Sequence, residues 1–363
     1  MSDIDFNPDW ISPPGDTIID ILRERSISRH EFAQHIEVTT EQAAEILLGV
    51  ARITEETARR LHKIVGGTIA FWLKRESQYS EELTRRGSRI AKGEAQRWLQ
   101  ELPLNYMVKA GWVEHASAPE ERLANCLRFF GVSNLSAWKQ YYCDAVEVAY
   151  RTSPSFQSHK GAVSTWLRLG EIQATSLDCA PWNREQFLKT LPTIRKLTRC
   201  DEPREFIPEL KRLCAKCGVA LAIVRAPNGC RASGATRFLS SERALMILSF
   251  RHLSDDHFWF TFFHEAGHLI LHGEGDVFLD ENDQITSVKE SEANDFANEV
   301  LIPSTFHAAF EDLQPETRAI VRFARTLGVS RGIIVGQLQH AGRVPRHHFN
   351  ALKQFFKWEE IGS

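Results

Sequence analysis

His264-Glu265-Ala266-Gly267-His268 places two imidazoles four residues apart, with a carboxylate directly after the first. Residues four apart on an α-helix share one face, so both imidazoles can bind one Zn²⁺ while Glu265 lies beside a metal-activated water. The flanking residues 257–263 and 269–271 are strongly apolar, which predicts a buried helix. Buried imidazoles and carboxylates cost free energy unless they bind something. The pattern therefore favours a zinc site over two histidines that are satisfied within a core.

A catalytic zinc site needs a third protein ligand, because its fourth position is left to water. His272 lies about 12 Å from His264 along the same helix, too far to share its metal. We interpret His272 as a helix C-terminal residue that is followed by Gly273. Leu271 and Glu274 replace the glycine and third histidine of the metzincin spacing, so that pattern is excluded.

Residues 289–303 supply the remaining candidates, and their apolar side chains recur at helical spacing. Glu290 and Asn294 lie together on one flank of the apolar stripe, whereas Glu292 falls on the polar side. Glu290 is therefore the better ligand, and Glu292 is expected to be solvated. Asn294 could accept a hydrogen bond from a ligand imidazole.

At these residues the chain resembles the ImmA/IrrE family of metallopeptidase-like proteins. Their signature joins His-Glu-x-x-His to a later Glu-x-x-Ala-Asn-x-Phe-Ala-like helix that closes in Leu-x-Pro, which corresponds here to residues 290–297 and 301–303. The resemblance implies that His264, His268 and Glu290 hold zinc and that Glu265 is the catalytic carboxylate. Peptide hydrolysis is the implied reaction. Its developing oxyanion needs a further donor, for which the candidates are His257, His340 and Arg343.

Composition limits where this chemistry takes place. A length of 363 residues suggests two or three domains, and a net charge of −3 gives no whole-chain attraction to nucleic acid. The chain shows neither an N-terminal apolar signal region nor an apolar run of membrane-spanning length, and it has an odd number of cysteines, seven. We expect a cytoplasmic protein without a membrane partner. Cys214 and Cys217 form a lone Cys-x-x-Cys, a weak signal for a second zinc.

Residues 16–76 read as a run of short helices in helix-turn-helix order. The predicted helices are 16–25, 29–35 after the capping pair Ser28 and Glu31, 40–48, and 55–65 after Thr54. This order, with the tail Ile69-Ala-Phe-Trp-Leu73, resembles the DNA-binding domains of the XRE/HigA type.

Whether this domain binds DNA is left open by its charge. Thr39, Thr40 and Gln42 stand at the start of the recognition-position helix, where Gln42 could read adenine, but Glu41 and Glu45 make that helix acidic. Residues 1–80 carry 9 Lys and Arg against 13 Asp and Glu, a net charge of −4. Two interpretations compete: an operator-binding domain, and a retained fold that serves dimerisation or partner docking. Five arginines could still cluster locally: Arg25, Arg29, Arg52, Arg59 and Arg60.

The remaining segments complete the predicted architecture. Residues 87–200 are helical without a chemical motif, and regulators that fuse a HigA-like domain to an ImmA/IrrE-like domain have a similar helical middle. Strands are predicted at 219–225, 237–239 and 244–250, followed after Pro303 by helices at 316–327, 331–340 and 347–356. Residues 273–284 form an acidic loop.

These features predict an α+β, predominantly helical protein: a helix-turn-helix domain (1–86), a helical connecting region (87–200), and a zincin-like metallopeptidase domain with a small sheet and C-terminal helices (201–363). The resemblance implies a zinc-dependent endopeptidase whose substrate is a protein, such as a transcriptional repressor or antitoxin. The alternative is a non-catalytic HigA-like antitoxin or transcriptional regulator that binds DNA or a toxin and has a structural zinc. A homodimer is a further expectation.

Overall fold

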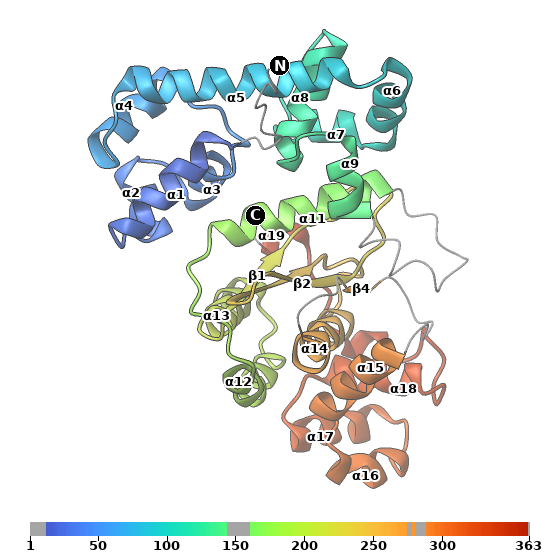
Figure 1. Ribbon diagram of the computed structural model, residues 1–363. Coiled ribbons are helices and arrows are strands. Elements are labelled where there is room, and N and C mark those ends of the chain that lie inside the picture. The colour runs from blue at the N-terminus through green and yellow to red at the C-terminus, as the bar shows by residue number, and fades with distance from the viewer. Residues whose placement is uncertain (1–11, 144–159, 274–277, 281–287, 362–363) are drawn as a thin grey trace. The chain divides into compact units, whose positions relative to one another are not determined.

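The computed structural model of the chain describes residues 12–143, 160–273, 278–280 and 288–361 (Figure 1). Of these, residues 12–143 and 160–178 form one compact unit, and residues from 179 onward form the other. The predicted α+β, predominantly helical class is confirmed, because helices dominate and the described residues form one small sheet. The three-part division with boundaries at 86 and 200 remains a prediction. Of the described residues between those boundaries, those up to 178 belong to the first unit and those from 179 onward belong to the second.

The first unit is helical throughout its described residues. The four helices that follow the first begin at hydroxyl caps: Ser28 and Glu31 form the predicted capping box, and Thr39 and Gln42 form a second one. A core that includes the fully buried Trp72 joins these helices. The elements of the unit are α1 (Pro14–Glu24), α2 (Arg29–His35), α3 (Thr40–Leu47), α4 (Glu55–Ile64), α5 (Ile69–Arg89), α6 (Lys92–Glu101), α7 (Leu104–Lys109), α8 (Pro119–Phe130), α9 (Leu135–Trp138), the π-helix η1 (Lys139–Cys143) and α11 (Lys160–Thr175).

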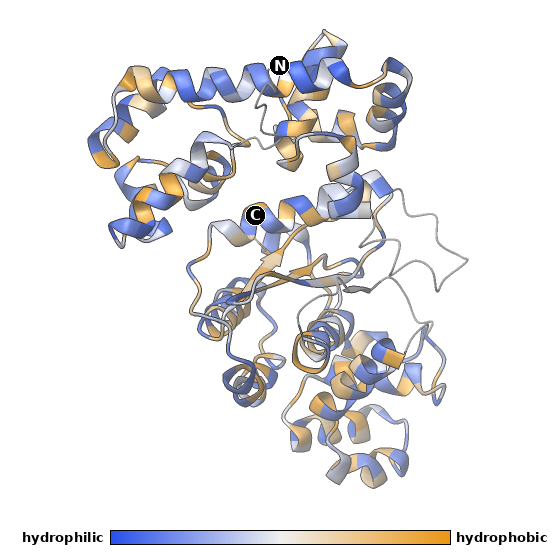
Figure 2. Cartoon of the chain, in the orientation of Figure 1, coloured by the Kyte–Doolittle hydropathy of each residue, from blue (hydrophilic) through white to orange (hydrophobic). Residues whose placement is uncertain are grey.

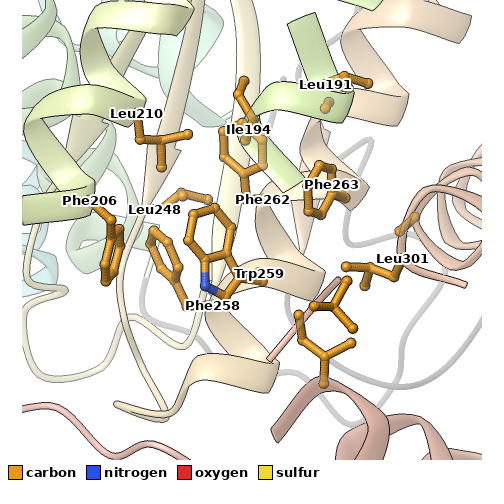
Figure 3. Close-up of a cluster of buried hydrophobic side chains, with 14 of the residues drawn as sticks. Leu191, Ile194, Phe206, Leu210, Leu248, Phe258, Trp259, Phe262, Phe263 and Leu301 are labelled. Atoms are coloured by element: carbon orange, nitrogen blue, oxygen red, sulfur yellow. The ribbon is translucent and has the colours of Figure 1, made fainter. Parts of the chain in front are cut away.

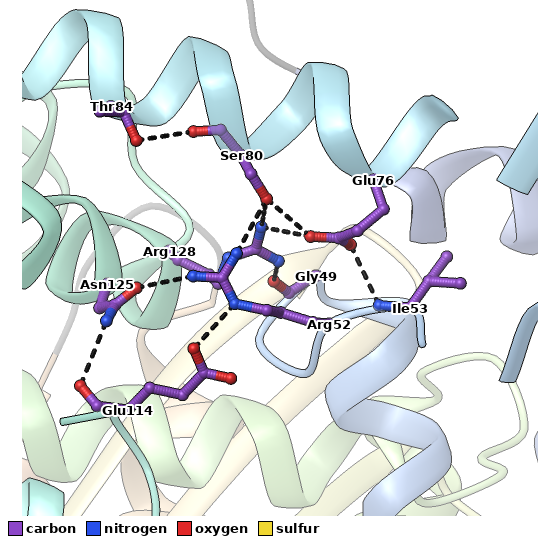
Figure 4. Close-up of polar contacts among 9 residues, drawn as sticks. All are labelled: Gly49, Arg52, Ile53, Glu76, Ser80, Thr84, Glu114, Asn125 and Arg128. Carbon is purple, nitrogen blue, oxygen red and sulfur yellow. Dashed lines mark hydrogen bonds and ion pairs between the residues drawn. The ribbon is translucent and has the colours of Figure 1, made fainter. Parts of the chain in front are cut away.

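A polar network fastens the turn after α3 to α5 and α8 (Figure 4). The guanidinium of Arg128 donates to the Gly49 carbonyl oxygen at 2.9 Å and to the Glu76 carboxylate at 2.6 Å. Arg52 donates to Ser80 at 3.0 Å and to the Glu114 carboxylate at 2.8 Å. Arg128 and Glu76 are nearly buried, so this ion pair holds both charges through direct hydrogen bonds.

The second unit contains a four-stranded sheet with strand order β1-β3-β2-β4. β1 (Val219–Ile223) pairs parallel to β3 (Arg243–Leu248), and β2 (Gly234–Ser240) pairs antiparallel to β3 and to β4 (Phe278–Asp280). The strands are largely hydrophobic, whereas α5 of the other unit is mainly hydrophilic (Figure 2). The unit's other elements are α12 (Arg184–Leu197), α13 (Pro203–Ala215), α14 (Asp255–Leu271), α15 (Val288–Leu301), η2 (Ser304–Phe306), α16 (His307–Glu311), α17 (Thr317–Leu327), α18 (Arg331–His340), η3 (Asn350–Leu352) and α19 (Trp358–Ile361).

Helix α14 runs through the core of this unit. Its apolar side chains, among them Phe258, Trp259, Phe262 and Phe263, pack with residues of α12, α13, β3 and α15 (Figure 3). The prediction of a buried helix around the two histidines is confirmed, since only three of the seventeen α14 residues are not buried. Among the described residues, no helix combines the length and the apolar character needed to cross a membrane.

The predicted helix at 347–356 is wrong. Phe349 has a positive φ of 61°, which interrupts helical geometry, and only the 3₁₀ turn η3 follows it. The chain then pairs with the start of α14: the backbone N–H of Asp255 donates to the Gln354 carbonyl, and the N–H of Gln354 donates to the Asp255 carboxylate. Lys353 forms a buried ion pair with Asp256 at 2.6 Å. The acidic loop predicted at 273–284 lies outside the described residues, apart from Gly273 and β4.

Candidate metal centre

The site is built where α14 crosses α15. Gly267 makes this close approach possible, because a Cβ at that position would lie 3.2 Å from the Ala293 Cα. Glycine suits this position because it has no side chain to separate the two backbones. Ala293 and Ala297 are fully buried against α14, so small residues on both helices bring their polar side chains together.

Three of the predicted side chains converge at this crossing. His264 Nε2 lies 3.0 Å from His268 Nε2, while the Glu290 carboxylate oxygens lie 3.2 Å from His264 Nε2 and 3.4 Å from His268 Nε2. With bonds of about 2.0–2.1 Å, tetrahedral zinc places neighbouring ligand atoms roughly 3.3 Å apart. The three observed separations, 3.0, 3.2 and 3.4 Å, are close to this distance between neighbouring ligand atoms. The donor set is one nitrogen from each imidazole and one carboxylate oxygen, which suits zinc.

Both imidazoles are oriented by a second hydrogen bond at Nδ1. His264 Nδ1 lies 2.9 Å from the Asn294 amide oxygen, and His268 Nδ1 lies 3.1 Å from His272 Nδ1. His272 is in turn held at Nε2 by the Glu292 carboxylate, at 2.9 Å. The arrangement at Asn294 is the one expected from the helical wheel. His272 is the C-cap residue of α14 and Glu292 is exposed, as expected, but their hydrogen bonds to the site were not predicted.

If both Nε2 atoms are to bind a metal ion through their lone pairs, the hydrogen bonds at Nδ1 determine the tautomer of each histidine. A neutral imidazole carries a single N–H, so His264 and His268 must each carry it on Nδ1. His264 then donates to the Asn294 oxygen, and His268 donates to His272 Nδ1. His272 must consequently carry its own proton on Nε2, where it donates to Glu292. Two lone pairs would face each other at 3.0 Å beside a carboxylate, an arrangement that a bound cation relieves.

The electrostatics of the site keep its ligands in the required protonation states. Burial lowers the pKa of His268 to about 4, so this imidazole is neutral at pH 7. Burial alone would raise the pKa of Glu290, but its contacts with His264 and His268 outweigh it and lower the pKa to about 2. Glu290 is therefore a carboxylate, and a metal ion between the three groups would act on its pKa in the same direction.

Glu265 is fully buried against the first residue of β2. A Cβ on Gly234 would lie 2.4 Å from Glu265 Oε1 and 2.7 Å from its Cγ, so the carboxylate occupies space that only a glycine leaves open. Gly234 also pairs with Leu248 of β3 and Asp280 of β4, which fixes its backbone within the sheet. The sheet thus sets the position of Glu265.

The three candidates for an oxyanion donor have other contacts. Arg343 donates to the carbonyl oxygens of Phe310 and Leu313, and His257 stacks on His252 with ring centroids 4.2 Å apart. His340 lies 6.4 Å from the Phe260 ring. The donor stays unassigned.

The predicted DNA-contacting residues lie at the start of α3, in the other unit. Thr39 Oγ1 accepts a hydrogen bond from the Gln42 N–H at 3.2 Å, and Gln42 Oε1 accepts one from the Thr39 N–H at 3.1 Å. A bidentate contact of Gln42 with adenine would require this capping box to open. Thr39 and Gln42 are exposed, and Thr40 is half-buried.

The sequence analysis did not predict the contacts that Gly234, His272 and Glu292 make at the site. A signal for two of them was present, because His272 continues the four-residue spacing of His264 and His268, and Glu292 is two residues from Glu290. Four-residue neighbours on a helix touch, so His272 could have been assigned to His268. Gly234 had no local signal, since its role depends on where β2 lies against α14.

Comparisons with known proteins match both units. The sequence profile of the IrrE N-terminal-like domain, a peptidase M78 family, matches residues 227–338, which include α14 and α15. In its N-terminal region the chain is 34% identical over 67 residues to the uncharacterised HTH-type transcriptional regulator YddM of Escherichia coli K12. That alignment covers 18% of this chain and 71% of YddM. No solved structure matches the chain.

Proposed function

Because the chain belongs to the ImmA/IrrE family and has an N-terminal helix-turn-helix domain, we propose that it is a zinc-dependent endopeptidase that regulates a protein partner by cleaving it. The observation that supports this most strongly is the convergence of His264, His268 and Glu290 with separations close to a tetrahedral edge. The proposed substrate is a transcriptional repressor or an antitoxin-like protein. The proposed location is the cytoplasm, where the cysteines of the chain would remain thiols.

Each residue has a distinct task in this proposal. His264, His268 and Glu290 would hold zinc, which supplies water activation and polarisation of the scissile carbonyl. Glu265 takes the proton of the attacking water and returns it to the leaving amine. Burial in the low-dielectric core strengthens the interactions of Glu265 with reacting groups. Asn294 and the His272–Glu292 pair orient the two imidazoles and fix their tautomers.

Glu265→Gln tests the proposal, because it keeps the side-chain shape and removes the base. We expect zinc content and folding to persist while cleavage of the partner falls by several orders of magnitude. The partner can be sought by co-expressing neighbouring genes with the wild type or the variant, followed by a search for a protein that only the wild type shortens. A matched control is Glu299→Gln, on the exposed side of α15, which should cleave like the wild type. A Glu265→Gln variant that acts normally in the cell would contradict catalysis and favour the non-catalytic regulator.

Gly234→Ala provides a second test that leaves all the proposed ligands in place. The added methyl group would displace the Glu265 carboxylate, and a misplacement of about 1 Å costs roughly 100-fold in rate. Gly93→Ala in α6 is the matched control, since a Cβ there meets nothing within 4 Å. Equal cleavage rates for Gly234→Ala and Gly93→Ala would show that the position of Glu265 does not affect the reaction.

A further inference from the structure

The C-terminal half of the side of α3 that faces away from its core is buried or half-buried. Ala43, Ile46 and Leu47 of α3 belong to the core of the helix-turn-helix domain. At 100° per residue, Glu41, Glu45 and the C-cap residue Leu48 lie on the opposite side, the side that a recognition helix turns to the major groove, with Ala44 at its edge. Glu41, in the first turn, is exposed. Ala44 is nevertheless only 1% exposed, and Glu45 and Leu48 are half-buried. Burial also raises the pKa of Glu45, with Glu41 adding to the effect.

The element available to cover this side is α11, which packs against α3 within the same unit. Thirteen of the sixteen α11 residues are buried, and the helix also packs against α6 and α8 of the same unit. The contact with α3 therefore belongs to the packed interior of the unit. An alanine and a leucine on the outward side of α3 suit such apolar packing better than contact with a charged duplex.

A carboxylate that follows α11 occupies the start of the neighbouring helix of the motif. Asp178 accepts hydrogen bonds from the backbone N–H groups of Arg29 and His30, each at 3.3 Å, and lies 4.0 Å from the Arg29 guanidinium. In helix-turn-helix complexes the first helix of the motif crosses the DNA backbone, and helix N–H groups contact phosphates. In this chain a side chain of the same unit makes the equivalent contact.

The arginines that could have formed a basic cluster have partners within the unit. Arg25 donates to the Ile64 carbonyl oxygen, and Arg60 donates to the Ile36 carbonyl oxygen, each at 2.8 Å. Arg59 pairs with Glu55 at 2.5 Å, and Arg52 belongs to the network of Figure 4. Phosphate contacts by these side chains would have to replace interactions that already exist.

We propose that the C-terminal half of the outward side of α3, at Ala44, Glu45 and Leu48, is an internal docking surface for α11, and that the full chain does not read DNA bases through Thr39, Thr40 or Gln42. This inference does not depend on the metal centre. It assigns the helix-turn-helix fold a packing role within the first unit, the second of the two interpretations that the sequence left open.

Site-resolved thiol labelling of the full chain tests the covered side directly. Ala44→Cys places a thiol on it, and Gln42→Cys is the matched control on the exposed flank of the same helix. We expect maleimide to modify Cys at 42 at least about 100-fold faster than Cys at 44, with mass spectrometry separating both from the native cysteines. Equal rates in folded protein would overturn the proposal.

DNA binding by the wild-type full chain gives a test that needs no variant to fold. Fluorescence anisotropy would be measured with a duplex from the region upstream of the protein's own gene, at 50 and 200 mM salt. We expect no sequence-selective binding at either concentration. Selective binding that weakens about 10³-fold or more between these salt concentrations would overturn the proposal. If Gln42→Ala lost this selective DNA binding while Gln34→Ala on α2 retained it, α3 would be identified as the helix that contacts the bases.

Discussion

Helices α3 and α14 each carry the motif that identifies their part of the chain, yet their environments differ. The polar residues of α14 turn toward α15, and the crossing of the two helices brings His264, His268 and Glu290 together. The C-terminal half of the outward side of α3 is buried or half-buried, and the first polar residues of the helix cap their own backbone. A motif whose chemistry depends on spacing within one helix can be read from sequence. A recognition surface depends also on what lies over it, which no local pattern records.

Removing a ligand should have the largest effect on the α14 side of this comparison. Loss of a ligand should weaken zinc binding by more than the roughly 10–100-fold that loss of a hydrogen-bonded partner of a ligand costs. We expect His264→Ala and Glu290→Ala to lose zinc on dialysis against a chelator, whereas Glu292→Ala, which is not a ligand, retains it. Metal analysis of the purified variants measures this. Full zinc in His264→Ala, or loss in Glu292→Ala but not in Glu290→Ala, would show that the ligand assignment is wrong.

The start of α14 should make stability depend on pH. Burial raises the pKa of Asp255 from 3.8 to about 6, with hydrogen bonds from Ser330 and Gln354 opposing the increase. A raised pKa means that this contribution to stability is complete below about pH 4 and is lost as pH rises through about 6. The free energy of unfolding of the wild type should fall relative to Asp255→Asn by about 3 kcal/mol over that interval. Urea unfolding at pH 4 to 7.5, with α14 followed by hydrogen exchange, measures it; a constant difference would contradict the prediction.

His272 gives a further test of the α14 site, because the sequence placed it at the end of the helix and did not predict its contact with His268. We expect His272→Ala to bind zinc about 10–100-fold more weakly, since orienting partners of metal-bound histidines contribute about this much. Glu292→Gln, which removes the charge but can still accept a hydrogen bond, should have a smaller effect. Competition with a chromophoric chelator measures these affinities. His307→Ala is the control, because His307 is exposed, lies 3.8 Å from Glu299 and is not part of the metal group. Wild-type affinity in His272→Ala would assign His272 to packing alone.

The smallest expected effect is on α3. Thr39→Ala removes the hydroxyl that caps the helix and should destabilise the first unit by about 1 kcal/mol. Thr40→Ala, one residue further on, has no capping hydroxyl to lose and should change stability by less than about 0.5 kcal/mol. Hydrogen exchange of α3 amides in the full chain distinguishes the two. Equal protection in both variants would mean that the capping box contributes nothing to the position of α3.

Sequence prediction succeeded where a pattern reports a local constraint. The α14 histidines, the Ser28 capping box and α18 at residues 331–340 follow from spacing, cap chemistry and periodicity, and the structure has them as expected. It failed at residues 347–356, whose apolar residues mimic helical spacing although they pair with the start of α14. Backbone pairing with a distant segment leaves no periodic signal.

The parts of the metal centre that could not be predicted arise from contacts between elements. Glu292 is 20 residues from His272, and their pairing depends on how α15 crosses α14. Gly234 is 31 positions before Glu265, and its role appears only when β2 lies against the helix. In the first unit, the helix α11 that packs against α3 lies more than 100 residues later in the chain. Such information belongs to tertiary packing.

The pairing between Asp255 and Gln354 also has a consequence for the order in which the protein is made. These residues are 99 positions apart. At a synthesis rate of about 5–20 residues per second, α14 leaves the ribosome roughly 5–20 s before the segment that fastens its first turn. During that interval the helix that carries His264, Glu265 and His268 lacks its anchor. The helix-turn-helix domain is therefore synthesised in full well before α14 is fastened, and the candidate metal site is among the last parts of the chain to be assembled.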